Sequence, residues 1–338
     1  MTSANAQIRL AAHPVGLPQP SDWDYTEQPA PQPGPGEFLV RVEYLSLDPA
    51  MRSWISGRHT YIEPVALGDV MRAGGIGRIV ASQHPDHQVG EIVSGRFGAQ
   101  RYTLCRDGEV TKVDTALAPA PTHLAALGIA GLTAYFGLFD VGRLEPGQTV
   151  VVSGAAGAVG SIAGQIARIT GCRVIGIAGG PAKCATLVDE LGFDAAIDYK
   201  AGDVRARLRE HAPDGVDLFF DNVGGAILDD VLTCLATGAR VVISGAIAQY
   251  NATQQAPGPS NYLQLLTKRA SMTGFVIFDY ADRYPEAMTR LAEWISTGEL
   301  VSFEHLVQGD IKDFPETLLT LFRGGNTGKL ILALPQDQ

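Results

Sequence analysis

A predicted strand, a glycine-rich turn and a predicted helix follow one another near the middle of this chain. Thr149–Ser153 reads TVVVS, a short apolar run that predicts a buried strand. Ala155–Gly160 then has the pattern AxGxxG, with alanine in the first glycine position, and Gly157–Thr170 is predicted to be a helix. In such a turn, Gly157 lets the backbone approach a pyrophosphate, and Gly160 lets the helix pack against the strand. The unit therefore predicts a dinucleotide site on a helix-covered sheet.

The alternation of strands and helices continues downstream of this turn. Strands are predicted at Arg173–Ala178, Ala195–Asp198, Val216–Asp221 and Arg240–Ser244, and helices at Ala182–Leu191, Val204–His211 and Ala226–Leu235. Strand stretches such as VVV and VVIS are apolar on both faces, as expected of parallel strands that helices cover on both sides. This pattern predicts an α/β fold with a doubly wound parallel sheet.

The first 120 residues have a different pattern, with short strands and many glycines and prolines. Glu37–Ser46 alternates apolar and polar residues, and Gly75–Ala81 and Val89–Phe97 give further short β-like runs. Glycine and proline interrupt these runs, which indicates many turns. This half is predicted to be a small, irregular β-barrel. The apolar segment Leu124–Val141 that follows is long enough for one or two packed helices.

The residues after the second predicted strand bear on the choice between NAD and NADP. A site for NAD usually has an acid there, which binds the ribose 2′-hydroxyl. Here the strand ends in Gly179-Gly180, and the next acid, Asp189, lies inside the predicted helix. Lys183 follows instead, and its ammonium group can pair with a 2′-phosphate. This favours NADPH over NADH; the alternative is that Lys183 is an ordinary solvated residue of the first helical turn.

Charge and cysteine content exclude several other classes of protein. The formal net charge is −10, which disfavours binding to nucleic acid or to an anionic membrane surface. The four cysteines are scattered and have neither disulfide nor zinc-site spacing. Residues 1–10 do not resemble a signal peptide, and no run of 18 apolar residues exists to span a membrane. We therefore expect a cytoplasmic protein without a metal.

Seven short motifs distributed along the chain identify a family. The chain resembles the zinc-independent medium-chain dehydrogenases/reductases, within them the branch of prostaglandin reductase/leukotriene B4 12-hydroxydehydrogenase and its curcumin-reductase-like and plant double-bond-reductase relatives. The resemblance implies a GroES-like catalytic domain at 1–125, a Rossmann NADPH-binding domain at 126–300, and a C-terminal return to the catalytic domain at 301–338. The matching motifs are Leu45–Arg52 (LSLDPAMR), Gly131–Gly137 (GLTAYFG), Gly154–Ser161 (GAAGAVGS), Gly192–Lys200 (GFDAAIDYK), Phe220–Gly225 (FDNVGG), Gly245–Asn251 (GAIAQYN) and Gly325–Lys329 (GNTGK).

The resemblance also implies a reaction and a set of cofactor residues. The reaction is NADPH-dependent reduction of the carbon–carbon double bond in α,β-unsaturated ketones and aldehydes. Lys183 and Tyr199 are implied to hold the 2′-phosphate. The full set of implied cofactor residues is Ala155, Gly157, Ala158, Val159, Gly160, Lys183, Tyr199, Asn222, Ser244, Gly245, Ala246, Ile247, Tyr250, Phe275, Val276, Ile277 and Asn326.

Zinc-bearing relatives in the wider superfamily place a cysteine ligand near Ser46-Leu47-Asp48. This chain has no cysteine in that stretch, so another group must stabilise the charge of the enolate formed from the substrate. A tyrosine hydroxyl can donate a hydrogen bond to that oxygen. Tyr250 is the first candidate for a catalytic residue and Tyr61 the second, and protonation by solvent is a third possibility.

The segment Phe275–Tyr280 reads FVIFDY and has high β-propensity. It is predicted to be an edge strand. In the superfamily such a strand often pairs across a dimer, so the resemblance implies a homodimer.

Two other functions remain open on the sequence alone. A quinone oxidoreductase would share the fold and the cofactor, and activity on an enone that is not a quinone would separate the two enzymes. A cofactor-binding protein that is not an enzyme, and is structural or associated with nucleic acid, is a further alternative. The acidic net charge argues against that third function.

Overall fold

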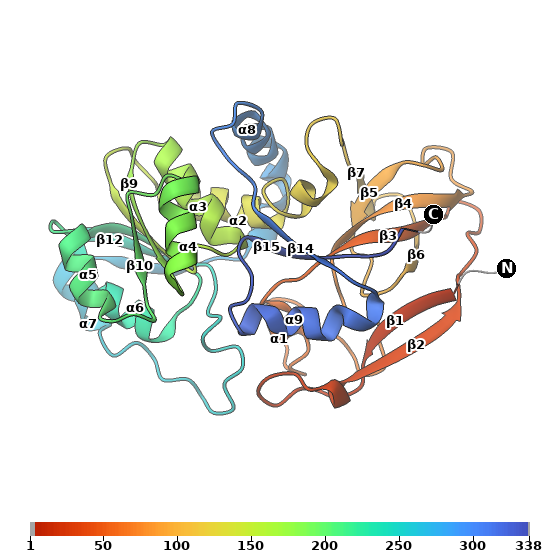
Figure 1. Ribbon diagram of the computed structural model, residues 1–338, viewed down its shortest axis with the longest axis horizontal. Helices are drawn as coiled ribbons and strands as arrows, with labels where there is room; N and C mark the ends of the chain where they lie inside the picture. Colours follow the sequence, from red (N-terminus) through yellow and green to blue (C-terminus); the bar gives the residue numbers. More distant parts are fainter. Residues whose placement is uncertain (1–3, 337–338) are drawn as a thin grey trace. The chain divides into compact units, whose positions relative to one another are not determined.

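The computed structural model describes residues 4–336, which form two compact units (Figure 1). One unit consists of Met1–Leu124 with Glu304–Gln338, of which residues 4–124 and 304–336 are described. The other consists of Ala125–Phe303. No helix in the described part of the chain is long and apolar enough to cross a membrane.

A parallel sheet forms the centre of the unit Ala125–Phe303. Its strand order is β10-β9-β8-β11-β12-β13, and every neighbouring pair runs parallel. The chain winds outward from β8 in one direction and from β11 in the other, so the strand order reverses between these two strands. The strands are β8 (Thr149–Ser153), β9 (Arg173–Ala178), β10 (Ala195–Asp198), β11 (Val216–Asp221), β12 (Leu235–Ile243) and β13 (Ser271–Gly274).

Helices connect these strands, as the alternating pattern predicts for a parallel sheet. The predicted Rossmann-type α/β fold of this unit is confirmed, and the predicted bounds of β8, β9, β10, β11 and α5 agree with the structure. The helical segments are α2 (Ile129–Phe136), η3 (Gly137–Val141), α3 (Ala158–Ile169), α4 (Pro181–Ala185), η4 (Thr186–Glu190), α5 (Val204–His211), α6 (Gly225–Leu232), α7 (Leu263–Lys268), η5 (Ile277–Arg283) and α8 (Tyr284–Ser296).

The prediction that Phe275–Tyr280 forms an edge strand is wrong. The edge strand is β13, which ends at Gly274, and η5 begins at Ile277 as a 3₁₀ helix. Ile277 is buried in an apolar cluster with Phe136, and the ring of Tyr280 stacks on Phe136 with centroids 4.8 Å apart. Packing against α2 thus overrides the β-propensity of this segment, because that propensity mainly reflects the packing that a sheet offers.

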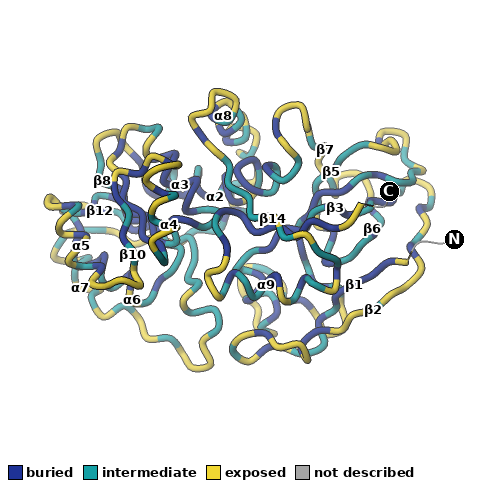
Figure 2. The backbone as a smooth tube through the Cα atoms, viewed as in Figure 1, coloured by how far each residue is buried: buried dark blue, intermediate teal, exposed yellow. Residues whose placement is uncertain are grey.

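The other unit is built around a mostly antiparallel sheet with the strand order β14-β15-β3-β4-β5-β7, with β6 also paired to β3. A separate two-stranded sheet pairs β1 with β2. The C-terminal segment returns to this unit, because β15 pairs antiparallel with β3, with Ile331 opposite Ser46. Figure 2 shows β3 mostly in the dark blue of buried residues. The strands are β1 (Ala4–Leu10), β2 (Trp23–Pro29), β3 (Phe38–Ser46), β4 (Gly75–Ser82), β5 (Ile92–Gly95), β6 (Tyr102–Cys105), β7 (Val110–Lys112), β14 (Glu304–Gln308) and β15 (Lys329–Ala333), and the helical segments are η1 (Pro20–Asp22), α1 (Met51–Trp54), η2 (Ala120–Leu124), η6 (Ile311–Asp313) and α9 (Phe314–Phe322).

Candidate active site

The predicted cofactor residues of the unit Ala125–Phe303 all follow the carboxyl ends of parallel strands. Since these ends lie at one edge of the sheet, residues far apart in the chain are brought to that edge, where open α/β sheets bind ligands. Tyr61 and Asn326 belong to the other unit. The placements are Ala155–Gly160 after β8, Lys183 after β9, Tyr199 after β10, Asn222 after β11, Ser244–Tyr250 after β12 and Phe275–Ile277 after β13.

The turn after β8 has the close backbone approach that a pyrophosphate site needs. Gly154 has a φ of +57°, and the N–H of Gly157 donates to its carbonyl at 2.9 Å. A Cβ on Gly160 would lie 2.4 Å from that same carbonyl oxygen, so α3 packs on the turn at a distance only glycine permits. The first N–H groups of a helix lack acceptors within it and attract anions. This turn therefore fits the pyrophosphate of a dinucleotide.

Alanine in the first glycine position of the turn is accommodated by the neighbouring strand. Ala155 is fully buried, and its N–H donates to the carbonyl of Ile177 in β9 at 3.1 Å. Its Cβ lies 3.0 Å from the place that a Cβ on Gly176 would take. The methyl group of Ala155 thus uses space that β9 leaves open at Gly176.

The loops after β9 and β10 are tied together by the carboxylate of Asp198. Its Oδ1 accepts hydrogen bonds from the N–H of Gly180 at 2.8 Å and from the N–H of Lys200 at 2.9 Å. These two donors lower the pKa of Asp198, because they stabilise the ionised carboxylate. Gly180 has a φ of +98°, a conformation that favours glycine, and is followed directly by α4.

Lys183 lies in the first turn of α4, beside the loop after β10. Its side chain is half-buried, and burial lowers the pKa of its ammonium group, with a further contribution from the positive charge of Lys200. The ring of Tyr199 lies close to Gly179, because a Cβ on Gly179 would lie 2.8 Å from Cε1 of Tyr199. The structure therefore places Lys183 and Tyr199, the two predicted 2′-phosphate residues, at neighbouring strand ends.

A buried carboxylate organises the turn after β11. Oδ1 of Asp221 accepts hydrogen bonds from Ser153 Oγ at 2.6 Å, from Val223 N at 3.0 Å and from Gly224 N at 3.1 Å. Burial raises the pKa of Asp221, and these donors oppose part of that rise. Asn222 is fixed by the same cluster, because its Nδ2 donates to the carbonyl of Ser153 at 2.8 Å.

The loop that carries Tyr250 is docked on this turn. The N–H groups of Ser244 and Gly245 both donate to the carbonyl of Asp221, at 2.8 and 3.1 Å. The hydroxyl oxygen of Tyr250 accepts a hydrogen bond from Ala246 N at 3.3 Å, so the side chain lies back on its own loop.

The predicted site residues of the other unit occupy two separate segments. Tyr61 is 51% exposed, and its hydroxyl accepts a hydrogen bond from Nε1 of Trp54 at 3.4 Å. Asn326 is buried, and its Nδ2 donates to the carbonyl of Gly328 at 2.8 Å, which fixes the amide within the GNTGK turn.

Lys329, the last residue of that motif, is 2% exposed and was not among the predicted site residues. Its Nζ donates to the carbonyl of Leu47 at 3.0 Å and pairs with Asp48, whose other oxygen accepts from Ser46 Oγ at 2.6 Å. These are the positions near which zinc-bearing relatives have a cysteine ligand. In residues 4–336, no group of three or more His, Cys, Asp or Glu residues is placed to hold a metal ion. A lysine at the start of the apolar run KLILAL was the one signal of this role in the sequence.

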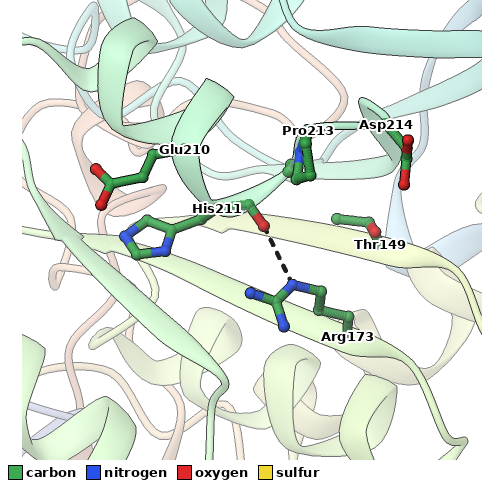
Figure 3. A pocket seen from close by; sticks show the side chains of 7 residues that line it. Thr149, Arg173, Glu210, His211, Pro213 and Asp214 are labelled. Carbon is green, nitrogen blue, oxygen red and sulfur yellow. Dashed lines mark hydrogen bonds between the residues drawn. The ribbon is translucent and has the colours of Figure 1, made fainter.

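A hollow of about 290 Å³ lies in the same unit as the parallel sheet (Figure 3). Thr149 and Arg173, the first residues of β8 and β9, contribute to it, and Arg173 Nε donates to the carbonyl of His211 at 3.1 Å. It therefore lies at the amino ends of the strands, opposite to the edge that carries the predicted cofactor residues. Because ligands of open α/β sheets bind at the carboxyl edge, this hollow is not the cofactor site.

Comparisons with known proteins agree with the geometry of this edge. Residues 6–113 match the family of the N-terminal domain of oxidoreductase, and residues 158–293 match the family described as zinc-binding dehydrogenase. The chain is 38% identical to an NADPH-dependent curcumin reductase of Escherichia coli, with 98% of each chain covered. It is 35% identical to a 2-alkenal reductase (NADP(+)-dependent) of Nicotiana tabacum, covering 99% of this chain and 98% of that protein. The crystal structure of CurA in complex with NADPH from Vibrio vulnificus is 42% identical, has a TM-score of 0.92, and is matched over 98% of this chain and 100% of CurA.

Proposed function

We propose, because the chain belongs to the zinc-independent branch of the medium-chain dehydrogenase/reductase family, that it reduces the carbon–carbon double bond of α,β-unsaturated ketones and aldehydes with NADPH. The observation that carries this function is the set of predicted nucleotide residues at the carboxyl ends of six parallel strands. Relatives that match nearly the whole chain are, by name, an NADPH-dependent curcumin reductase and an NADP(+)-dependent 2-alkenal reductase. Family, fold class, cofactor and reaction class thus agree with those predicted from the sequence.

The residues at this edge fit NADPH in charge and in shape. The turn Gly154–Gly160 and the first turn of α3 would hold the pyrophosphate, and Lys183 with Tyr199 would hold the 2′-phosphate. Asn222, Ser244–Tyr250 and Phe275–Ile277 would line the remainder, and Asn326 stays a prediction from the resemblance. When bound, NADPH supplies the hydride for the β-carbon of the substrate.

The chain itself must then stabilise an enolate and deliver a proton to the α-carbon. We assign to Tyr250 the role of hydrogen-bond donor to the enolate oxygen. Its hydroxyl oxygen is held by the N–H of Ala246. Tyr61, held through its hydroxyl by Trp54, is the second candidate. A preorganised donor of this kind contributes about 10²–10³ in rate when it is aimed at a developing oxyanion.

A substrate screen tests the reaction. NADPH oxidation is followed with 2-alkenals, simple enones, 15-keto-prostanoid-like lipids, curcuminoids and quinones. We expect turnover of enones that are not quinones, and with deuterium-labelled NADPH the label should appear on the β-carbon. Reduction of quinones alone would make the protein a quinone oxidoreductase. Activity should survive chelation, and its loss with recovery on added zinc would contradict a metal-free mechanism.

We also propose that the protein is a homodimer joined at β13. This strand is the edge of the parallel sheet, and all four of its residues are exposed. The preceding helix α7 packs against β12, yet its residues Leu263 and Leu266 are 59% and 74% exposed. An open edge strand near exposed apolar side chains favours pairing with a second copy. Light scattering should give twice the mass of the chain, and Leu266→Lys should lower that mass, whereas Leu306→Lys in the other unit should not.

A cytoplasmic location completes the proposal. All four cysteines are free thiols, and three of them are buried, which suits a reducing compartment. Cell fractionation tests this location, and recovery of the protein outside the cytoplasmic fraction would overturn it.

A further inference from the structure

Two lysines lie in the segments that follow β9 and β10. Lys183 is in the first turn of α4, and Lys200 is the second residue after β10. Their charges act on one another, because the positive charge of Lys200 contributes to the lowered pKa of Lys183. Like charges brought together by a fold are stabilised when an anion binds between them.

The side chain of Lys200 turns back over the end of β9. A Cβ on Gly179, the first residue after β9, would lie 3.0 Å from Cε of Lys200 and 2.8 Å from Cε1 of Tyr199. Nζ of Lys200 is 6.0 Å from the centroid of the Tyr199 ring. The ammonium group of Lys200 is therefore one bond from an atom that lies against Gly179, where an NAD site has its acidic residue.

The main chain holds Lys200 in this position. Its N–H donates to Asp198 Oδ1 at 2.9 Å, and the same oxygen accepts from Gly180 N at 2.8 Å. The segments that carry the two lysines are thus joined through one carboxylate oxygen, that of Asp198. Glycine at 179 leaves room for the stem of Lys200, which any larger residue would displace.

We propose that Lys200 is a second cationic residue for the 2′-phosphate, and so a specificity-determining residue that favours NADPH over NADH. The inference rests on the proposed function, which makes NADPH the cofactor. A phosphate monoester carries a charge of about −1.5 to −2 near neutral pH, more than the single charge of Lys183 neutralises. Lys200, whose Cε lies 3.0 Å from the position of a Cβ on Gly179, supplies the second charge.

The alternative is that Lys200 only packs its stem over Gly179. Two substitutions separate these roles: Lys200→Met keeps an unbranched stem without the charge, and Lys200→Arg keeps the charge. Lys312→Met, at an exposed residue of the other unit, is the control for the loss of one positive charge. Thermal unfolding of all variants verifies that the fold is retained.

Binding of adenosine 2′-monophosphate and adenosine 5′-monophosphate by calorimetry is the direct test. Lys200→Met should lower the affinity for the 2′-monophosphate about tenfold, as expected for the loss of one charge-assisted hydrogen bond. The affinity for the 5′-monophosphate should stay unchanged. Lys200→Arg should retain most of the affinity, and Lys312→Met all of it. Equal weakening of both nucleotides by Lys200→Met, or none, would overturn the proposal, as would a wild-type protein that does not distinguish them.

Kinetics give a second and independent readout. For Lys200→Met, KM for NADPH should rise about tenfold, while kcat with NADPH and both constants with NADH stay unchanged. A fall in kcat with both cofactors would assign Lys200 a structural role instead. Failure to reduce any enone would contradict the proposed reaction, but it would leave the nucleotide titrations fully readable, so the two failures are distinguishable.

Discussion

The hydroxyl of Ser153 donates a 2.6 Å hydrogen bond to the carboxylate of Asp221, and neither residue is accessible to solvent. Ser153 ends β8 and Asp221 ends β11, the two neighbouring strands between which the strand order reverses. The turn Gly154–Gly160 begins directly after Ser153, and the turn that carries Asn222 begins directly after Asp221. This one contact therefore joins the two halves of the proposed nucleotide site at its centre.

Replacing Ser153 with alanine should lower the stability of the protein and weaken its binding of the cofactor. The change removes a donor to the carboxylate of Asp221 and the acceptor of the Asn222 N–H, so buried polar groups lose partners. Such losses typically cost about 1–3 kcal/mol. Urea unfolding measures the effect, with the exposed Ser296→Ala as control. A free energy of unfolding equal to that of the wild type would show that this contact does not join the strands.

The pH dependence of stability should reveal the raised pKa of Asp221. Because burial raises this pKa in the folded state, the native protein keeps the proton to higher pH than the unfolded chain does. The contribution of this group is therefore largest below 3.8, the ordinary pKa of aspartate, and declines as pH rises through the raised value.

Asp221→Asn removes this titration and serves as the reference. Between about pH 4 and pH 8, the stability of the wild type relative to the variant should fall as pH rises. Urea unfolding at a series of pH values measures the difference. Parallel curves, or a difference of the opposite sign, would contradict the burial of a titrating carboxyl here.

Lys183→Met should reduce kcat/KM for NADPH by about 10- to 100-fold and leave that for NADH nearly unchanged. A hydrogen bond to a charged group contributes about 1.5–3 kcal/mol. NADH has no 2′-phosphate, so its binding does not depend on this hydrogen bond. Steady-state kinetics with both cofactors measure the ratio. If Lys183 is a solvated helix residue instead, the two cofactors will be affected alike.

Tyr250→Phe should lower kcat more than it weakens NADPH binding, because the hydroxyl is assigned to the enolate oxygen. The loss expected for one such donor is about 10²–10³. Fluorescence titration of NADPH gives the binding constant, which should change little because the loop remains docked on Asp221. Tyr61→Phe is the matched variant: a large loss there and none at Tyr250 would exchange their roles, and no loss at either would favour protonation by solvent.

Gly160→Ala should disrupt the turn Gly154–Gly160. The new Cβ would lie 2.4 Å from the carbonyl oxygen of Gly154, so α3 must move away from the turn. We expect NADPH affinity to fall by at least about tenfold and unfolding to occur at lower temperature, since overpacking typically costs about 1–3 kcal/mol. Gly258→Ala, which meets no atom within 4 Å, is the control. Unchanged NADPH affinity in Gly160→Ala would remove this turn from the cofactor site.

Local pattern was sufficient for the elements of the parallel sheet. β8, β9, β10 and β11 were predicted with the bounds that the structure has, because buried parallel strands are short apolar runs separated by turns. Phe275–Tyr280 was predicted incorrectly for the opposite reason. Its side chains have the composition of a strand, but contacts with Phe136, 139 positions earlier than Phe275, decide its conformation.

The dinucleotide turn, the absence of an acid after β9 and the family could all be predicted from the sequence, because each depends on residue types at fixed local spacing. Three contacts could be known only from the folded chain: Ser153 bonds to Asp221, Lys329 binds Asp48, and Lys200 crosses over Gly179. These contacts join residues from different strand ends. They depend on strand order and on the direction of each side chain, which no local pattern of residues specifies.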